Sequence, residues 1–271
     1  MSGIFNPDNG FFRLMSKLWD VIVLSVIWCV CCFPLYFAYT FLVSDFVSAV
    51  DLLIKCVLDA ICMIPVGPAI AALYYAVVKS VRKDRNYVIR SYFHAFKVNF
   101  RQGAIISAVI GVAATFISFN LHYAYLSSKT DIKFAQITFV TTGAVTILTV
   151  VFASMVFPIL SRFSFTMLNL IKMTFYISCR HILWTLLVIA VLAASAIGIY
   201  IILPLLFVLP AITALICSFP IEHILKRYMV AIEKKAADAE DENASGKDSD
   251  KNEKNASDTD MTFNKDKWYL E

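Results

Sequence analysis

Long apolar runs alternate with short polar segments along this chain of 271 residues. Roughly 20 apolar residues in a helix are enough to cross the hydrocarbon core of a bilayer, and the last run is about twice that length, which predicts a helical hairpin. The pattern therefore predicts about six membrane segments. The apolar runs lie within residues 21–43, 50–78, 103–126, 135–160 and 182–225.

Composition favours a helical membrane bundle over a soluble domain or a β-barrel. The chain is 59% hydrophobic and 16% charged, whereas a typical soluble domain is about 25% charged. No alternation of apolar and polar residues recurs at the length of a barrel strand. A helix satisfies its own backbone hydrogen bonds in lipid. The predicted fold class is all-α: a multi-pass helical membrane bundle.

The basic residues beside the apolar runs predict the orientation of the chain. Cytoplasmic loops carry an excess of Lys and Arg, and 16 of these residues fall on one side of the predicted spans against three on the other, Lys55, Lys129 and Lys133. Both termini are therefore expected in the cytoplasm. Residues 1–235 hold 19 basic and 9 acidic residues, a balance that suits anionic lipid headgroups better than nucleic acid.

The polar segments on the cytoplasmic side have a helical pattern of their own. In residues 85–101, aromatic and basic residues each recur at steps of three and four, which predicts an amphipathic interfacial helix. Residues 163–181 are similar. We expect this surface to bind headgroups or a partner protein. The candidate docking residues are Arg90, Phe93, Phe96, Lys97, Asn99, Phe100, Arg101, Arg180 and His181.

The second apolar run carries both a helix breaker and charges. Pro65, Gly67 and Pro68 predict a break between two half-helices, with Pro68 at the first position of the second one. Asp51, Lys55 and Asp59 share one helix face at spacings of four.

Two interpretations of these charges stay open. They line a substrate or ion path beside the broken helix, as in many transporters. Alternatively, the helix lies in the outer interface with its ion pairs exposed. Residues 36–62 accordingly either span the membrane or lie at its outer surface.

The end of the chain has a different character. Residues 236–271 hold 5 basic and 11 acidic residues, and residues 236–260 have almost nothing to bury, which predicts a disordered tail. The aromatic residues Phe263, Trp268 and Tyr269 return at its end. The predicted domains are a helical membrane domain, 1–235, and this cytoplasmic tail, 236–271.

Catalytic and cofactor motifs are missing from the sequence. It lacks nucleotide-binding glycine loops and the common hydrolase motifs, and its seven Cys lie in or beside apolar segments, where unpaired Cys packs as a small hydrophobe. We therefore expect no enzyme activity, no metal and no cofactor. Glu222 and His223 are expected to be solvated at the inner end of the last span.

Four motifs of the sequence stand out together. They are Phe5-Asn6-Pro7-Asp8-Asn9, Gly67-Pro68-Ala69 followed by Ala71-Ala72-Leu73-Tyr74-Tyr75, Phe93-x-x-Phe96-Lys97-x-Asn99-Phe100-x-Gln102, and Arg180-His181 with Trp184-Thr185. These motifs resemble the YesL-like family of uncharacterised bacterial membrane proteins (domain of unknown function 624). The resemblance covers roughly residues 1–230, with about 25 extra residues near 36–62.

The resemblance implies a multi-pass protein of the bacterial plasma membrane, in a family often encoded near carbohydrate-uptake systems. It implies no reaction and no catalytic residue. We therefore expect a non-catalytic accessory or regulatory partner of a transport permease for carbohydrate. The alternative is a small secondary transporter or exporter with its site at the broken second helix.

Overall fold

The structure, a computed structural model, describes residues 10–35, 49–82, 87–129, 131–163, 166–225 and 228. Every regular element within these residues is a helix, which confirms the all-α prediction. The predicted disordered tail with its aromatic end, residues 36–48 and the motif at residues 5–9 lie outside the described residues.

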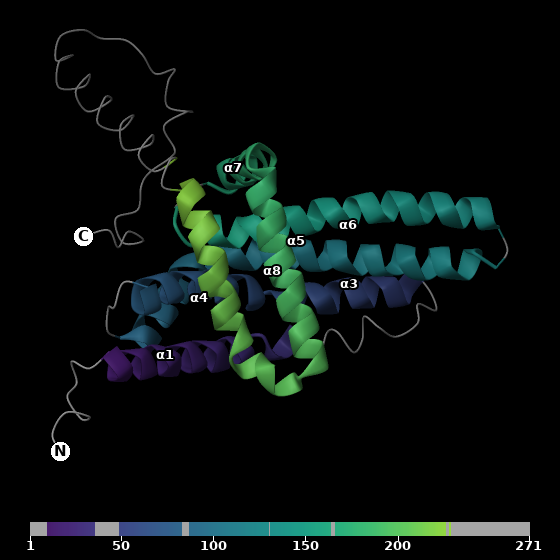
Figure 1. Ribbon diagram of the computed structural model, residues 1–271. Helices are drawn as coiled ribbons and strands as arrows, with labels where there is room; N and C mark the ends of the chain where they lie inside the picture. Colours follow the sequence, from purple (N-terminus) through teal and green to yellow (C-terminus); the bar gives the residue numbers. More distant parts are fainter. Residues whose placement is uncertain are drawn as a thin grey trace, which may run out of the picture.

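The helices follow the apolar runs of the sequence. In chain order they are α1 (Gly10–Cys31), α3 (Ala49–Met63), α4 (Val66–Ala76), the π-helix η1 (Val77–Arg82), α5 (Val88–Ser127), α6 (Ile132–Leu160), α7 (Met167–Arg180), α8 (Ile182–Ile201), the 3-10 helix η2 (Leu203–Phe207) and a final helix, Leu209–Leu225 (Figure 1).

Four helical segments in the described part of the chain are long and apolar enough to cross a membrane. They are Val50–Lys79, Val88–Ser127, Ile132–Leu160 and Ile182–Ile201. The final helix is apolar but shorter. These lengths support a membrane protein, while the crossing of α1 and of the final helix stays a prediction.

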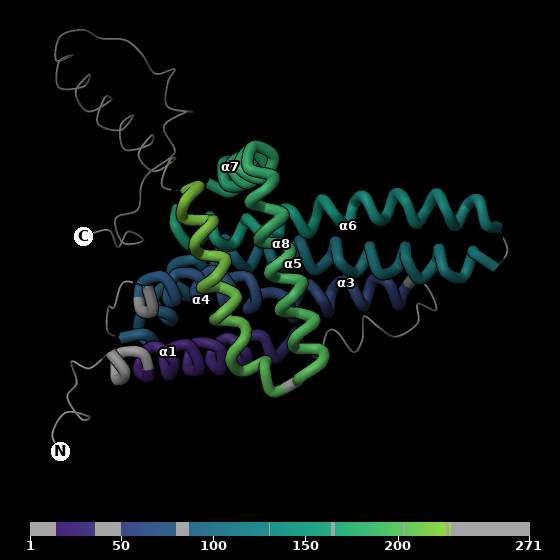
Figure 2. The backbone as a smooth tube through the Cα atoms, viewed as in Figure 1, coloured from purple at the N-terminus to yellow at the C-terminus, as the bar shows by residue number. Residues whose placement is uncertain are grey.

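α5 and α6 lie side by side and extend beyond the rest of the molecule, with α3 alongside them (Figures 1 and 2). Asp131 caps the start of α6 by accepting hydrogen bonds from the backbone amides of Lys133 and Phe134. Such a cap satisfies amides that have no partner within the helix. The cap begins α6 directly after the short turn that follows α5.

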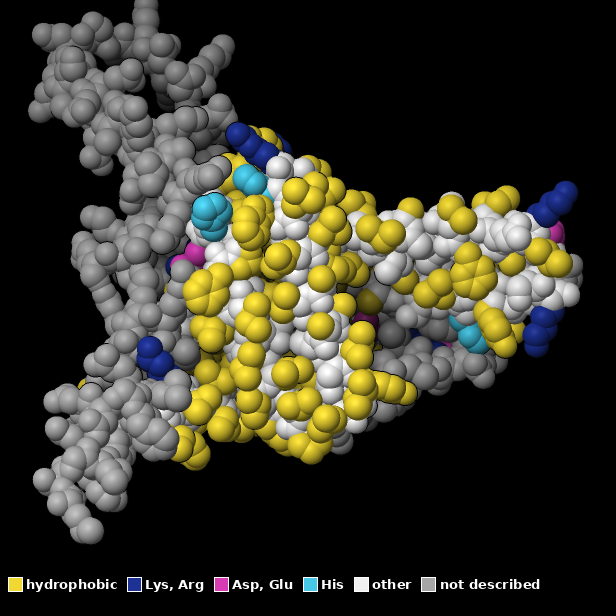
Figure 3. Space-filling model, in the orientation of Figure 1, with side chains coloured by type: hydrophobic (Ala, Val, Ile, Leu, Met, Phe, Trp, Pro, Cys, Tyr) yellow, Lys and Arg dark blue, Asp and Glu magenta, His cyan; other side chains and the backbone are white. Residues whose placement is uncertain are grey.

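The last apolar run forms the predicted hairpin. Trp184 near the start of α8 contacts His223 near the end of the final helix, with ring centroids 5.8 Å apart. A Cβ atom on Gly198 would lie 3.3 Å from Leu209 at the opposite end of the pair. The pair is therefore antiparallel, and hydrophobic side chains cover much of its visible face (Figure 3).

α1 is tied to this hairpin by one buried hydroxyl. Ser25 donates to the carbonyl of Val208 at 3.2 Å and accepts from the amide of Ala211 at 3.1 Å. Ala211 lies in the first turn of the final helix, where backbone amides lack a partner in their own helix. Ser25 thus caps the final helix from a different segment of the chain.

One element differs from the sequence prediction. Residues 88–127 form a single helix of 40 residues, about 60 Å long at the helical rise and twice the thickness of a bilayer core. The predicted interfacial helix of residues 85–101 is therefore continuous with the following span and projects from it. No Gly or Pro interrupts residues 88–102, so the helical pattern runs on.

Candidate functional site

The predicted break in the second apolar run is present. α3 ends at Met63, a turn follows at residues 64 and 65, and α4 begins at Val66. The sequence predicted Pro68 at the first position of the second half-helix. In the structure Pro68 is the third residue of α4. The first four amides of a helix lack an intrahelical acceptor, so proline is tolerated in this turn without losing a hydrogen bond.

The joint between α3 and α4 presses closely against α5. A Cβ atom on Gly67 would lie 2.3 Å from the carbonyl oxygen of Gly103, and one on Gly103 would lie 2.9 Å from the backbone nitrogen of Pro68. Only glycine at both positions allows the two backbones to approach this far. Small residues serve the same purpose between helices in membranes.

Asp59 is buried where α3 meets α5. It is 5% exposed and accepts a hydrogen bond of 3.0 Å from the hydroxyl of Thr115. A Cβ atom on Gly111 would lie 3.3 Å from the carboxylate and 2.7 Å from Met63. The absence of a side chain at Gly111 therefore makes the space in which Asp59 reaches Thr115.

The other two charges of α3 lie one and two turns away. Lys55, which is 4% exposed, forms an ion pair of 3.3 Å with Asp51. Lys55 and Asp59 are both buried, which differs from the exposed ion pairs that the interfacial alternative expects. Whether residues 36–62 span the membrane or lie at its outer surface stays a prediction. The contacts of Asp59 with Thr115 and of Met63 with Gly111 show that α3 lies lengthwise against α5.

Sequence reasoning missed the partner surface on α5. Gly103, Ser107, Gly111 and Thr115 recur at steps of four and form one stripe of small residues. All four are buried, and each faces the α3–α4 segment. Thr115 bonds to Asp59 at 3.0 Å, Ser107 lies 2.8 Å from a Cβ placed on Gly67, and a Cβ on Gly103 or Gly111 would lie within 3 Å of this segment. The spacing is visible in the sequence and typical of close helix packing in membranes.

The N-terminal end of α5 presents a different surface. Phe93 is 51% exposed and Phe100 is 43% exposed. They lie seven residues apart and so share one face of the helix. The basic side chains beside them are exposed as well, and the rings of Phe96 and Phe100 lie 5.6 Å apart. We call this surface the α5 face: Ile89, Arg90, Phe93, His94, Lys97, Phe100 and Arg101.

Two predicted docking residues do not belong to the α5 face. Asn99 is buried, and its side-chain amide donates to the carbonyl of Ala95 at 2.9 Å. Phe96 is half-buried and packs against the core. Tyr92, an aromatic residue of the same amphipathic stretch, is fully buried and donates to the carbonyl of Ala69. This side of α5 therefore packs on the α4 region.

The second amphipathic stretch forms α7, a helix separate from α8. Leu170, Thr174 and Ile177 are buried, whereas Arg180 is exposed and its guanidinium donates to the hydroxyl of Tyr176. His181 is half-buried at the junction, 3.3 Å from the hydroxyl of Tyr228. Of these two predicted docking residues, only Arg180 is exposed.

Glu222 differs from its prediction. Its carboxylate is buried and accepts a hydrogen bond from the guanidinium of Arg162, which is buried as well. Burial of an acidic group is tolerated when an opposite charge compensates it. The partner lies 60 residues away in sequence, so local patterning could not reveal the pair.

Among the residues that the structure describes, no group of three or more His, Cys, Asp or Glu side chains is placed to hold a metal ion.

Comparison with known proteins supports the resemblance found in the sequence. Residues 18–121 match the family described as "Protein of unknown function, DUF624". The matched region runs from α1 through the α3–α4 joint into the C-terminal half of α5. No curated protein and no solved structure matches the chain.

Proposed function

We propose that this chain, whose residues 18–121 match the DUF624 family, has a non-catalytic role as an accessory or regulatory partner of a transport permease in the bacterial plasma membrane. The observation that carries the proposal is the α5 face. The family resemblance adds carbohydrate as the transported class. The proposed topology places both termini and the α5 face in the cytoplasm, in accord with the bias of basic residues.

The chemistry of the α5 face suits a protein partner. Exposed aromatic side chains supply large apolar contact areas, and aromatic residues and Arg are enriched where protein interfaces bind most tightly. Phe100 follows Ile89 by eleven positions, so the stripe is about 16 Å long along the helix. The α5 face belongs to the same continuous helix as the following span. A partner bound to this face is therefore connected directly to the membrane part of the chain.

The proposal is tested by affinity purification of the full chain from its native membranes in mild detergent. The unchanged chain should recover a transport permease in stoichiometric amount. Replacing Phe93 and Phe100 with Ser should remove most of the permease. A matched control is Tyr125→Ser, which replaces an exposed aromatic residue at the other end of the same helix. Equal recovery with all three chains would contradict the proposal.

The buried Asp59 favours a second candidate, a small secondary transporter or exporter. A carboxylate within a candidate span is costly and typical of ion or substrate paths. Its bond to Thr115 beside a broken helix resembles the arrangement of transporter sites. Asp59→Asn should then abolish release of a trapped monosaccharide from proteoliposomes that contain the purified chain, and full release would contradict this function.

A further inference from the structure

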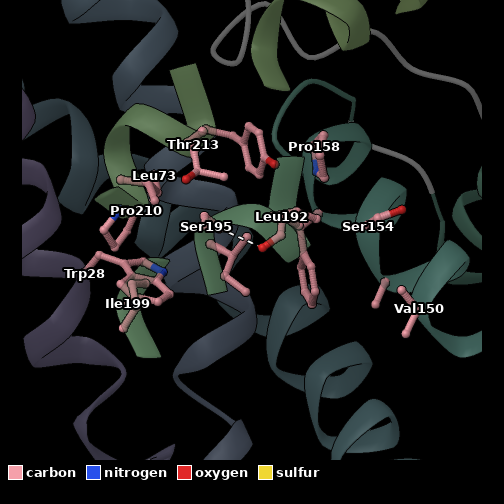
Figure 4. A pocket seen from close by; sticks show the side chains of 15 residues that line it. Trp28, Leu73, Val150, Ser154, Pro158, Leu192, Ser195, Ile199, Pro210 and Thr213 are labelled. Atoms are coloured by element: carbon pink, nitrogen blue, oxygen red, sulfur yellow. Dashed lines mark hydrogen bonds between the residues drawn. The ribbon is translucent and has the colours of Figure 1, made fainter. Parts of the chain in front are cut away.

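A cavity of about 320 Å³ lies among five helical segments of the described bundle. Its walls come from α1, α4, α6, α8 and the final helix, with Trp28, Leu73, Phe157 and Leu192 among the apolar residues (Figure 4). Ligand sites commonly begin near this size and are mostly apolar with a few polar groups. None of the α5 face residues lines the cavity.

The cavity wall consists of parts of the apolar helices. Leu192 and Ser195 lie in the middle of α8, eleven and fourteen residues into that helix. Thr213 follows the start of the final helix by one turn. Because most of the lining side chains are apolar, the cavity suits an occupant that is largely apolar.

The hydroxyl groups in the wall already have partners. Ser154, Ser195 and Thr213 each donate to a backbone carbonyl of their own helix, at 2.8 Å in all three cases. Tyr74 lies against Cys217. A sugar, which requires many hydrogen bonds, is poorly matched to such a wall.

One polar group in the cavity wall has no hydrogen-bond partner among the described residues. It is the indole Nε1 of Trp28, which is buried. In Figure 4 the indole nitrogen lies on the edge of the ring nearer the other labelled lining residues. An indole N–H can only donate, and a buried donor without an acceptor costs about 1–3 kcal/mol. The missing group is therefore a hydrogen-bond acceptor.

We propose that this cavity binds an acyl ester chain, whose hydrocarbon fills the apolar walls and whose carbonyl oxygen accepts the hydrogen bond of Trp28. The same chemistry is supplied by a bilayer phospholipid and by a free fatty acyl compound. A bound chain joins α1, α4, α6, α8 and the final helix across their interior.

The test is a titration of the purified full chain in detergent with methyl oleate, followed by native mass spectrometry. One saturable adduct is expected. Trp28→Phe should weaken methyl oleate binding about five- to tenfold, as expected for one hydrogen bond. The same substitution should leave the binding of 1-octadecene unchanged, because this hydrocarbon has no acceptor.

A second pair of variants tests the location. Ala153→Phe places a large side chain in the cavity wall and should abolish the saturable adduct. Val145→Phe, at an exposed position of the same helix outside the wall, should leave it unchanged. No saturable adduct, or an equal loss of both probes with Trp28→Phe, would overturn the proposal.

The source of the chain is resolved with dioleoyl phosphatidylglycerol in place of methyl oleate. Saturable binding of the phospholipid supports a bilayer lipid as the occupant. Saturable binding of methyl oleate alone supports a free acyl compound. Neither result depends on the α5 face, so this proposal and the docking proposal fail separately.

Discussion

The middle and the N-terminal part of α5 differ in what they contact. Between Gly103 and Thr115 the helix is lined with small residues, and the α3–α4 segment lies so close that Gly103 and Gly111 have no room for a Cβ atom. Between Ile89 and Arg101 it carries large aromatic and basic side chains, several of them exposed. One long helix can thus be packed against its neighbours in the middle and offer a surface near its N-terminal end.

This difference predicts that substitutions in the two parts will have separable effects. Changes in the packed middle part should lower the stability of the membrane domain. Changes on the α5 face should leave stability alone and affect only what the chain binds.

The largest loss of stability is expected from a substitution outside α5, the removal of the charge of Arg162. Arg162→Met leaves Glu222 buried without its ion pair, which costs about 3–5 kcal/mol. The measurement is the apparent melting temperature of the purified chain in detergent. Arg101→Met, which removes an exposed charge from the α5 face, is the control and should change stability by less than about 0.5 kcal/mol.

A double variant sharpens this prediction. Arg162→Met together with Glu222→Leu removes both charges and should recover much of the loss, because an apolar pair of similar size can replace a buried ion pair. A single Arg162→Met variant as stable as the unchanged chain would show that the pair does not form.

The next largest loss is expected at the tightest contact of α4 with α5. Gly67→Ala introduces a Cβ atom 2.3 Å from a backbone oxygen, and overpacking of this kind costs about 1–3 kcal/mol. Gly143→Ala is the matched control, since no atom lies within 4 Å of the added Cβ there. Equal melting temperatures of the two variants would rule out the close approach.

A loss of similar size is expected at Asp59. Thr115→Val keeps the shape of the side chain and removes the donor to the buried carboxylate, which costs about 1–3 kcal/mol. The control is Thr141→Val on the exposed side of α6, where the hydroxyl bonds only to its own helix. A melting temperature lowered equally by both substitutions would argue against a specific bond to Asp59.

The smallest effect on stability is expected on the α5 face. Phe93 and Phe100 are both exposed, so their replacement by Ser should change stability by less than about 0.5 kcal/mol each. A large drop in melting temperature would show that these rings support the fold instead of offering a surface.

Much of the architecture was predictable because membranes impose a strong length and polarity rule. The apolar runs gave the helices, and Pro65 with Gly67 and Pro68 gave the break between α3 and α4. The hairpin at the end of the membrane domain was likewise predicted from run length alone.

The contacts between helices were harder to predict. Periodicity groups Tyr92 with Phe93 as aromatic residues, but only packing decides that the first is buried on the α4 region and the second exposed. Arg162 looked like one more cytoplasmic charge, and its partner Glu222 is 60 residues distant. Such pairs depend on how helices assemble, which local patterns do not encode. The stripe at steps of four on α5 was the one unused local signal.

The most direct test of the central claim is the recovery of a transport permease with the full chain and with its Phe93→Ser, Phe100→Ser double variant. The account predicts stoichiometric recovery with the unchanged chain, a large loss with the double variant, and an unaltered melting temperature for both. Undiminished recovery of the permease with the double variant would contradict it.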